Sequence, residues 1–207
     1  MATASSHAFT RVRAVLAGAL VLGVGTTMTL ASWTDNEFGS GSFATTKFDV
    51  ESSINGGTSY ADTTSGSPAV LAFSATGMSP NTQRYGNILI RTKAGSVAGV
   101  LALGAAVISP SGTDETTVLG AALRYRVVLS TGACDATAFT GSPTWVVGPT
   151  ASVLTAGAAG TVAVAAATAS PGAATGLCFE VSLPSGAANT LQGKTSTALW
   201  QVTATSS

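Results

Sequence analysis

The sequence predicts an all-β protein: a jelly-roll-like antiparallel β-sandwich of about nine strands, preceded by a cleaved signal peptide. Apolar residues recur at every second position in short runs, and clusters of Gly, Pro, Ser and Thr separate these runs. Such alternation is typical of strands that bury one face. The third observation is an N-terminal apolar stretch that follows positive residues, which is the pattern of an export signal.

The expected signal peptide covers residues 1–32. Arg11 and Arg13 form its positive region, and an apolar, Gly- and Ala-rich stretch follows over residues 12–29. Thr29 and Ala31 are small residues at the positions that signal peptidase reads, so the small-residue rule places the cut between Ala31 and Ser32. A transmembrane anchor over 12–31 is the alternative, since about 20 apolar residues can span a bilayer. Several glycines and the lack of a following basic cluster favour cleavage.

The remaining chain of roughly 175 residues suits one domain. Only 9% of all residues are charged, and two of the nine basic residues fall in the expected signal, so the mature chain has two more acidic than basic residues. This balance excludes the clustered Lys/Arg footprint of a nucleic-acid-binding protein and a polybasic membrane face. Contact with a membrane is therefore expected only through the uncleaved signal. The low charge also weakens protection against pairing between sheet edges.

Residues 33–46 are expected to form a mobile N-terminal segment, and residues 47–207 the β-sandwich. The clearest strand covers residues 123–130, where Tyr125 and Val127 are expected to point inward and Arg124 and Arg126 outward. The full set of expected strands, in order, is 48–54, 68–75, 85–93, 97–108, 123–130, 144–147, 160–169, 176–183 and 195–205.

Two further regions carry weaker signals. Residues 114–122 begin with acidic residues after Thr113, which predicts a short helix with Thr113 as its N-cap. Residues 151–175 consist mostly of Ala, Gly, Thr and Ser, and fit either a pair of small-residue strands or a mobile crossover.

The chain contains two cysteines, Cys134 and Cys178, both after the expected signal. In an exported protein a disulfide is the natural pairing, and closing a loop of this length contributes about 4 kcal/mol in the chain-entropy model. The expected bond joins the loop after strand 123–130 to strand 176–183. A redox pair or a metal site is the alternative, but the sequence contains no C-x-x-C motif.

The sequence offers no catalytic constellation. The only histidine, His7, lies in the expected signal, so neither an H-E-x-x-H zinc site nor a Ser-His-Asp triad is present in the mature chain. Asp114 and Glu115 are adjacent, and adjacent residues point to different sides of a strand or helix. No phosphate-binding or dinucleotide motif occurs. We therefore expect no catalysis, no metal and no cofactor.

The block after the expected cut resembles the TasA/camelysin family of exported proteins. The resemblance rests on a small-residue cut followed by an aromatic-Thr-Asp sequence, a Ser-Phe pair and a hydrophobic-Asp-hydrophobic strand start. These are Trp33-Thr34-Asp35, Ser42-Phe43 and Phe48-Asp49-Val50. Alignment with the family favours the bond between Ser32 and Trp33.

Two later blocks are similar to the family as well. They are the turn Met78-Ser79-Pro80-Asn81 with the strand and connection that follow it, and the closing strand Ala198-Leu199-Trp200-Gln201-Val202. The chain departs from the family at Asn81 and at Lys93-Ala94, and its two cysteines are not part of the TasA pattern.

The resemblance implies a secreted, non-catalytic structural protein of the cell surface or biofilm matrix, processed by a SipW-type signal peptidase. It also implies self-association into fibres by donation of an N-terminal strand, with Trp33, Phe38 and Phe43 as the assembly residues. A monomeric adhesin or carbohydrate-binding module is the second hypothesis, in which Trp33, Trp145 and Trp200 would line a sugar site. Camelysin-type relatives are described as metallopeptidases, and this third hypothesis conflicts with the missing histidines.

Overall fold

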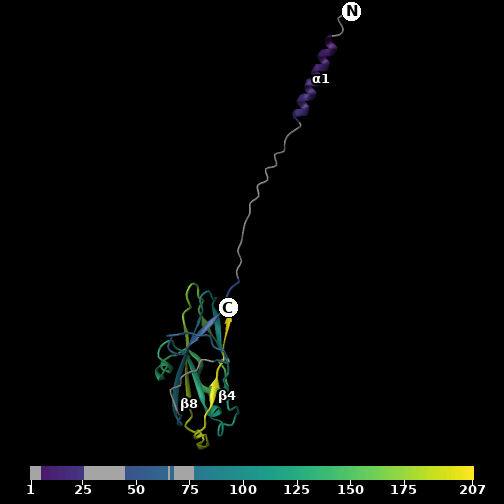
Figure 1. Cartoon of the computed structure of the whole chain (residues 1–207). Helices are drawn as coiled ribbons and strands as arrows, with labels where there is room; N and C mark the ends of the chain where they lie inside the picture. Colours follow the sequence, from purple (N-terminus) through teal and green to yellow (C-terminus); the bar gives the residue numbers. More distant parts are fainter. Residues whose placement is uncertain (1–5, 26–44, 65, 68–76) are drawn as a thin grey trace, which may run out of the picture. The chain divides into compact units, whose positions relative to one another are not determined.

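The computed structural model describes residues 6–25, 45–64, 66–67 and 77–207. The chain divides into two compact units, Met1–Phe43 and Ala44–Ser207. The described part of the first unit is helix α1 (Ser6–Gly25), drawn in purple in Figure 1. This helix covers most of the apolar stretch that the sequence analysis singles out. Among the described residues, no helix combines the length and the hydropathy needed to cross a membrane.

The second unit is built from antiparallel strands, which confirms the all-β prediction (Figure 1). A five-stranded sheet has the order β1-β2-β8-β5-β6, a three-stranded sheet the order β10-β3-β7, and β4 pairs with β9. The strands of the described residues are β1 (Val50–Ser53), β2 (Thr82–Thr92), β3 (Gly99–Leu103), β4 (Val107–Ser109), β5 (Arg124–Leu129), β6 (Trp145–Val153), β7 (Thr161–Val164), β8 (Thr175–Leu183), β9 (Thr197–Leu199) and β10 (Val202–Ser206).

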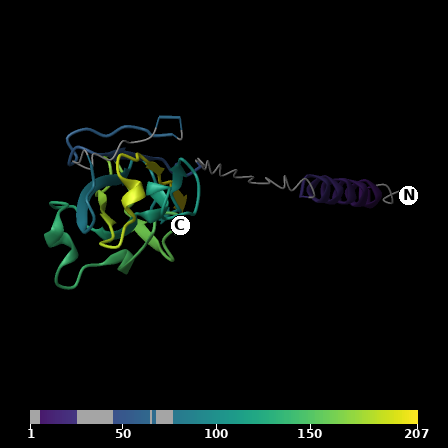
Figure 2. The same cartoon turned by 90° about the horizontal axis from the view of Figure 1, so that it is seen from below.

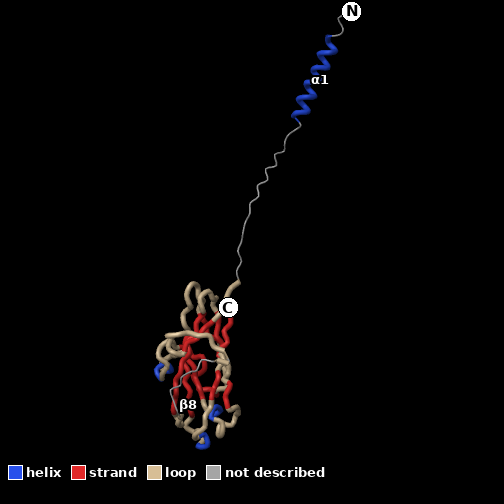
Figure 3. The backbone as a smooth tube through the Cα atoms, viewed as in Figure 1, coloured by secondary structure: helices blue, strands red, loops and turns tan. Residues whose placement is uncertain are grey.

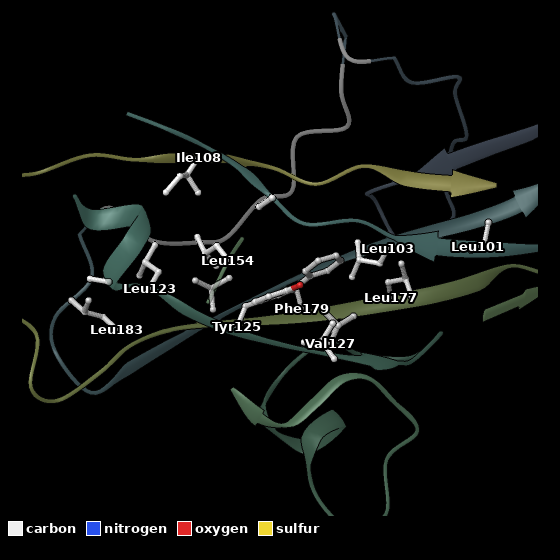
Figure 4. Close-up of a cluster of buried hydrophobic side chains, with 14 of the residues drawn as sticks. Leu101, Leu103, Ile108, Leu123, Tyr125, Val127, Leu154, Leu177, Phe179 and Leu183 are labelled. Atoms are coloured by element: carbon white, nitrogen blue, oxygen red, sulfur yellow. The ribbon is translucent and has the colours of Figure 1, made fainter. Parts of the chain in front are cut away.

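The hydrophobic core lies between the five-stranded sheet and the smaller sheets. Tyr125 and Phe179 from β5 and β8 are fully buried, and they point toward Leu103 of β3 and toward Leu154 (Figure 4). These residues occupy the inward positions that period-two alternation predicts for β5 and β8. Figure 3 shows the strands in the middle of the domain and the short helices α2 (Leu119–Ala122), η1 (Ala136–Phe139) and η2 (Asn189–Leu191) at its periphery.

Two predicted strands are each interrupted. The run 97–108 forms β3 and β4, and the run 195–205 forms β9 and β10. Both breaks lie at the same level, where the Gly104 amide donates to the Gln201 carbonyl and the Ala106 amide donates to the Leu154 carbonyl. The two runs pair with each other on both sides of the breaks, but their register shifts by one residue, which alternation cannot reveal. The predicted strand 68–75 lies outside the described residues.

The predicted helix 114–122 is shorter than expected, and the prediction of Thr113 as its N-cap was wrong. Only Leu119–Ala122 are helical. Asp114, not Thr113, organises the preceding turn: its carboxylate accepts hydrogen bonds from the Thr116 amide at 2.8 Å and the Thr116 hydroxyl at 2.7 Å. These hydrogen bonds lower the pKa of Asp114. A local bond of this kind competes with helix formation, so the acidic residues form a turn.

One detail of β5 also differs from the prediction. Leu129, expected to point inward, is half-buried, whereas Val128 is fully buried although it lies on the opposite face. The face that was expected to meet solvent is covered by the residues between β5 and β6, which project from the strands in Figure 2. Both faces of β5 are therefore buried near its end.

Candidate functional site

The residues proposed from sequence for processing and assembly cannot be placed. Ala31, Ser32, Trp33, Phe38 and Phe43 all lie outside the described residues. The description below therefore concerns the folded domain, where the disulfide, the charged side chains and the sheet edges define what a partner would meet.

The disulfide between Cys134 and Cys178 is confirmed. Its sulfur atoms are 2.01 Å apart, and the two Cα atoms are 5.4 Å apart. Cys178 is fully buried in the central strand β8, and Cys134 belongs to the residues between β5 and β6. We call residues 131–144 the cap segment. The bond fastens this segment to the outer face of the five-stranded sheet, and it stabilises the fold by restricting the unfolded chain.

Beneath the cap segment, a row of polar side chains crosses three strands. Tyr85 of β2 lies opposite Glu180 of β8, and Glu180 lies opposite Arg126 of β5. The Arg126 guanidinium donates from Nε at 2.9 Å and from Nη2 at 2.7 Å to the two carboxylate oxygens of Glu180. The Glu180 side chain is only 7% exposed. A buried carboxylate is costly unless it is paired, and this bidentate contact provides the pairing.

Aromatic rings enclose the ion pair. Phe139 lies 5.8 Å from the Tyr85 ring and 6.1 Å from the Trp145 ring. The Arg126 guanidinium is 5.3 Å from the Phe139 ring centre and 5.4 Å from that of Trp145, which suits cation–π attraction. Burial and the nearby Glu180 carboxylate raise the pKa of Tyr85. The two charged groups of this cluster are paired with each other and Phe139 packs over them, so the arrangement attaches the cap segment to the sheet.

A local hydrogen bond explains why Phe139 reaches this position. The Asp135 carboxylate accepts from the Thr137 hydroxyl at 2.6 Å and from the Thr137 amide at 2.8 Å, and it caps the short helix η1; these hydrogen bonds lower the pKa of Asp135. The sequence analysis placed Arg126 and Glu180 on the outward side of their strands correctly, but it did not detect that the cap segment covers them. The only hint in the sequence was Asp135-Ala136-Thr137, which can form a capped turn within the cap segment.

Removal of the buried carboxylate of Glu180 should destabilise the protein more than removal of the exposed carboxylate of Glu115. Glu180→Ala should lower the free energy of unfolding by about 2–4 kcal/mol, because it leaves the Arg126 charge beneath the cap segment without its counter-ion. Glu115→Ala is the matched control. Glu115 also contacts an arginine at 2.7 Å, but its side chain is 54% exposed, so its loss should cost at most about 1 kcal/mol. Urea denaturation of both variants checks this, and equal losses would contradict the structural role of the buried pair.

The other part of the outer face, over β1 and β2, is covered by a second segment. Residues 54–64 follow β1, and within them the Tyr60 ring lies 3.6 Å from the Arg91 guanidinium. Arg91 Nε also donates to the Glu51 carboxylate at 2.7 Å. This face of the five-stranded sheet therefore combines charged side chains with covering loops.

Charge is distributed very unequally between the sheets. Every charged residue within a described strand of the sandwich belongs to the five-stranded sheet: Glu51, Arg84, Arg91, Arg124, Arg126 and Glu180. The strands of the three-stranded and two-stranded sheets carry none. Two exposed apolar side chains lie opposite each other on the two-stranded sheet, Val107 at 71% and Leu199 at 39% exposure. The smaller sheets therefore present an uncharged surface built from Thr, Ala and Val.

Two of the tryptophans considered for a sugar site are engaged in packing. The Trp200 ring lies 5.6 Å from Tyr125 and 5.2 Å from Phe179, on the core side of the sheet. Trp145 belongs to the cluster on the other side, with Phe139 and Arg126. The two rings therefore do not form a shared platform on which a sugar could stack.

The described residues contain no group of three or more His, Cys, Asp and Glu side chains close enough to hold a metal ion. A shallow hollow of about 360 Å³ lies between β7 and the ends of β5 and β8, and Leu129, Val162 and Gly176 are among the residues that line it. Its polar side chains are hydroxyls only.

No protein-family model matches the chain, and no curated protein matches it.

Proposed function

We propose that the chain is an exported, non-catalytic structural protein of the cell surface or extracellular matrix, and that its copies associate by adding a strand to a sheet. The observation that carries this proposal is the contrast between the sheets. The five-stranded sheet is charged and covered by loops, whereas the smaller sheets are uncharged within their strands. Charged side chains are a common protection against edge pairing, and the smaller sheets lack it.

Two features of the N-terminal region support export. Helix α1 covers an apolar, Gly- and Ala-rich stretch behind Arg11 and Arg13. The small residues Thr29 and Ala31 then precede Trp33-Thr34-Asp35, the block that resembles the TasA/camelysin family. We propose that a SipW-type signal peptidase cuts here and frees residues 33–46. We also propose a jelly-roll-type connection between the sheets.

Cleavage has a direct test. N-terminal sequencing of the extracellular protein should find a chain that begins at Ser32 or Trp33, because the small residues before these positions fit the peptidase. Replacing Ala31 with a bulky residue, Ala31→Phe, should block cleavage before Ser32, whereas Ala14→Phe in the apolar stretch should not. A secreted chain that still carries Arg13 would contradict the proposal.

The freed segment has the properties of a donated strand. In an extended strand, successive side chains point to opposite faces. Trp33 and Phe38 are five positions apart, so a regular strand would turn them to opposite faces, and only one ring would enter the core side of a partner. The donated segment and the sheet edge that accepts it are different surfaces. Each pair of subunits therefore still has one unused N-terminal segment and one unused sheet edge. Such a contact repeats into open filaments unless it closes into a ring.

Electron microscopy and sedimentation of the purified mature protein test the proposed function. We expect filaments or concentration-dependent oligomers. A strictly monomeric protein at high concentration that binds glycans would replace the proposal with the adhesin hypothesis. Chelator-sensitive cleavage of casein by the pure mature protein would support the metallopeptidase hypothesis instead.

A further inference from the structure

One long stretch of the domain contains no charged residue. Between Asp135 and Glu180 the sequence has no Asp, Glu, Lys or Arg. This stretch forms β6, β7 and the connections around them, and most residues of these connections are exposed. On a well-hydrated protein surface, about 25–35% of the residues are charged. Hydration of this region therefore depends on hydroxyl groups and on the backbone.

The connection between β7 and β8 combines hydroxyl side chains with small residues and a proline. We call residues 165–174 the acceptor loop, and they read AAATASPGAA. Thr168 and Ser170 are both exposed, and so is Pro171. Segments that are rich in Ser and Thr and contain Pro are typical of chains that carry O-linked sugars. The composition of the acceptor loop therefore indicates a possible acceptor of sugars, and the structure shows which oxygens an enzyme could reach.

The backbone of the acceptor loop is fastened to buried residues of the domain. The Ala167 amide donates to the Ser96 carbonyl at 2.8 Å, and the Gly172 amide donates to the Thr92 carbonyl at 3.0 Å. Ser96 is 3% exposed and Thr92 is fully buried. These two contacts lie on either side of the hydroxyl pair in the loop. The loop therefore has a fixed place on the folded domain, with its two hydroxyl side chains at the surface.

Other hydroxyl groups beside the acceptor loop are engaged in the fold. The Thr92 hydroxyl donates to a carbonyl of the loop at 2.6 Å. The Thr175 hydroxyl donates at 3.1 Å to the Ala163 carbonyl on β7. A group attached to either of these oxygens would remove a hydrogen bond of the fold. Because Thr168 and Ser170 are exposed, a group on their oxygens would extend into solvent instead.

We propose that Thr168 and Ser170 are acceptors of O-linked sugars, which are transferred to the exported protein from a glycosyl phosphate donor. The hydroxyl oxygen forms a bond to the anomeric carbon of the sugar, and the bond between that carbon and the phosphate oxygen breaks. The phosphate leaves with the electron pair, and the hydroxyl proton passes to a base of the transferring enzyme. This inference rests on the export part of the proposed function and is independent of self-association.

Sugars at this position would provide the hydration that the region lacks in charged side chains. The acceptor loop follows β7, which is an edge strand of the three-stranded sheet. An attached sugar is bulky and solubilising. It would keep another sheet edge from approaching β7, which is the role that charged side chains have on many edge strands.

Mass spectrometry of the mature protein, purified from the cells that naturally produce it, tests the inference. We expect molecules that are heavier than the disulfide-bonded sequence by whole sugar residues. Fragmentation should place the added mass on peptides that contain Thr168 and Ser170. The same chain produced in a host without protein O-glycosylation should have the mass of the sequence alone.

Paired substitutions identify the acceptor oxygens. Thr168→Val combined with Ser170→Ala should remove the added mass completely. Ser142→Ala combined with Thr144→Val is the matched control, because these two residues are also exposed and flank a proline in the cap segment. The control protein should retain the full added mass. Loss of the sugars from the control and their retention in the loop variant would overturn the assignment.

The outcomes separate this inference from the proposed function. A secreted and cleaved chain with the bare mass of the sequence would show that export is right and that the acceptor loop is not modified. Sugars found only on other residues would also overturn the assignment of the loop. An unmodified chain that retains Arg13 and stays inside the cell would contradict both proposals.

Discussion

Removal of the disulfide by the double substitution Cys134→Ala and Cys178→Ala should lower the free energy of unfolding by about 4 kcal/mol. The bond joins residues separated by 44 positions, and a closed loop of that length restricts the unfolded chain by this amount in the chain-entropy model. For a domain of this size the melting temperature should fall by about 8–16 °C. Thermal and urea denaturation of the purified domain measure both quantities.

Reduction separates the effect of the bond from that of the two side chains. The wild-type protein in reducing agent should unfold close to the double variant, and the reducing agent should not affect the double variant itself. A loss below about 1 kcal/mol would show that the ion pair and aromatic contacts of the cap segment hold it without the bond. In that case the structural role assigned to the disulfide would be wrong.

The positions of the strands could be predicted where one apolar run forms one continuous strand. In β5 and β8, Tyr125, Val127, Leu177 and Phe179 alternate with polar residues and are buried as expected. Alternation reports which face a side chain occupies, and it does not report which backbone lies beside the strand. The breaks after Leu103 and Leu199 arise from a one-residue shift in the register between the same two runs, which no local pattern encodes.

The sequence analysis did not predict that the cap segment covers the outer face of the five-stranded sheet, for a similar reason. Arg126 and Glu180 occupy outward positions, and a charged residue in such a position normally meets solvent. They are covered because Cys134 and Phe139 belong to the segment that follows β5, which folds back over β5 and over the distant strand β8. The disulfide was predicted from the compartment and the number of cysteines, but its consequence for the neighbouring side chains depends on the register of three strands.

The candidate assembly surface was predictable only in part. A charged fraction of 9% indicates weak protection of sheet edges in general. Which edge is unprotected depends on the order of the strands, and on contacts such as those of Ser52 with Ala61 and of Thr175 with Ala163. These contacts protect β1 and β7 with neutral residues, so they leave no mark in the composition.

The truncation of the N-terminal segment should have the largest effect on function. Deletion of residues 33–41 from the mature protein should yield a folded monomer whose association is at least 100-fold weaker than that of the full mature chain. The described domain forms its compact unit without these residues, so the truncated protein should retain the melting temperature of the isolated wild-type subunit. Sedimentation across a range of concentrations measures the association.

The magnitudes explain why association should depend on single residues. Each added main-chain hydrogen bond contributes about 0.5–1.5 kcal/mol, and burial of one aromatic ring about 1.5–3 kcal/mol. Five or six such bonds and one ring together are only comparable to an association cost of about 4–15 kcal/mol. Phe38→Ala should therefore weaken association about tenfold or more, whereas Ser40→Ala, two positions further along the same face, should change it little. If truncated and full mature proteins sediment identically as monomers at high concentration, strand donation is wrong.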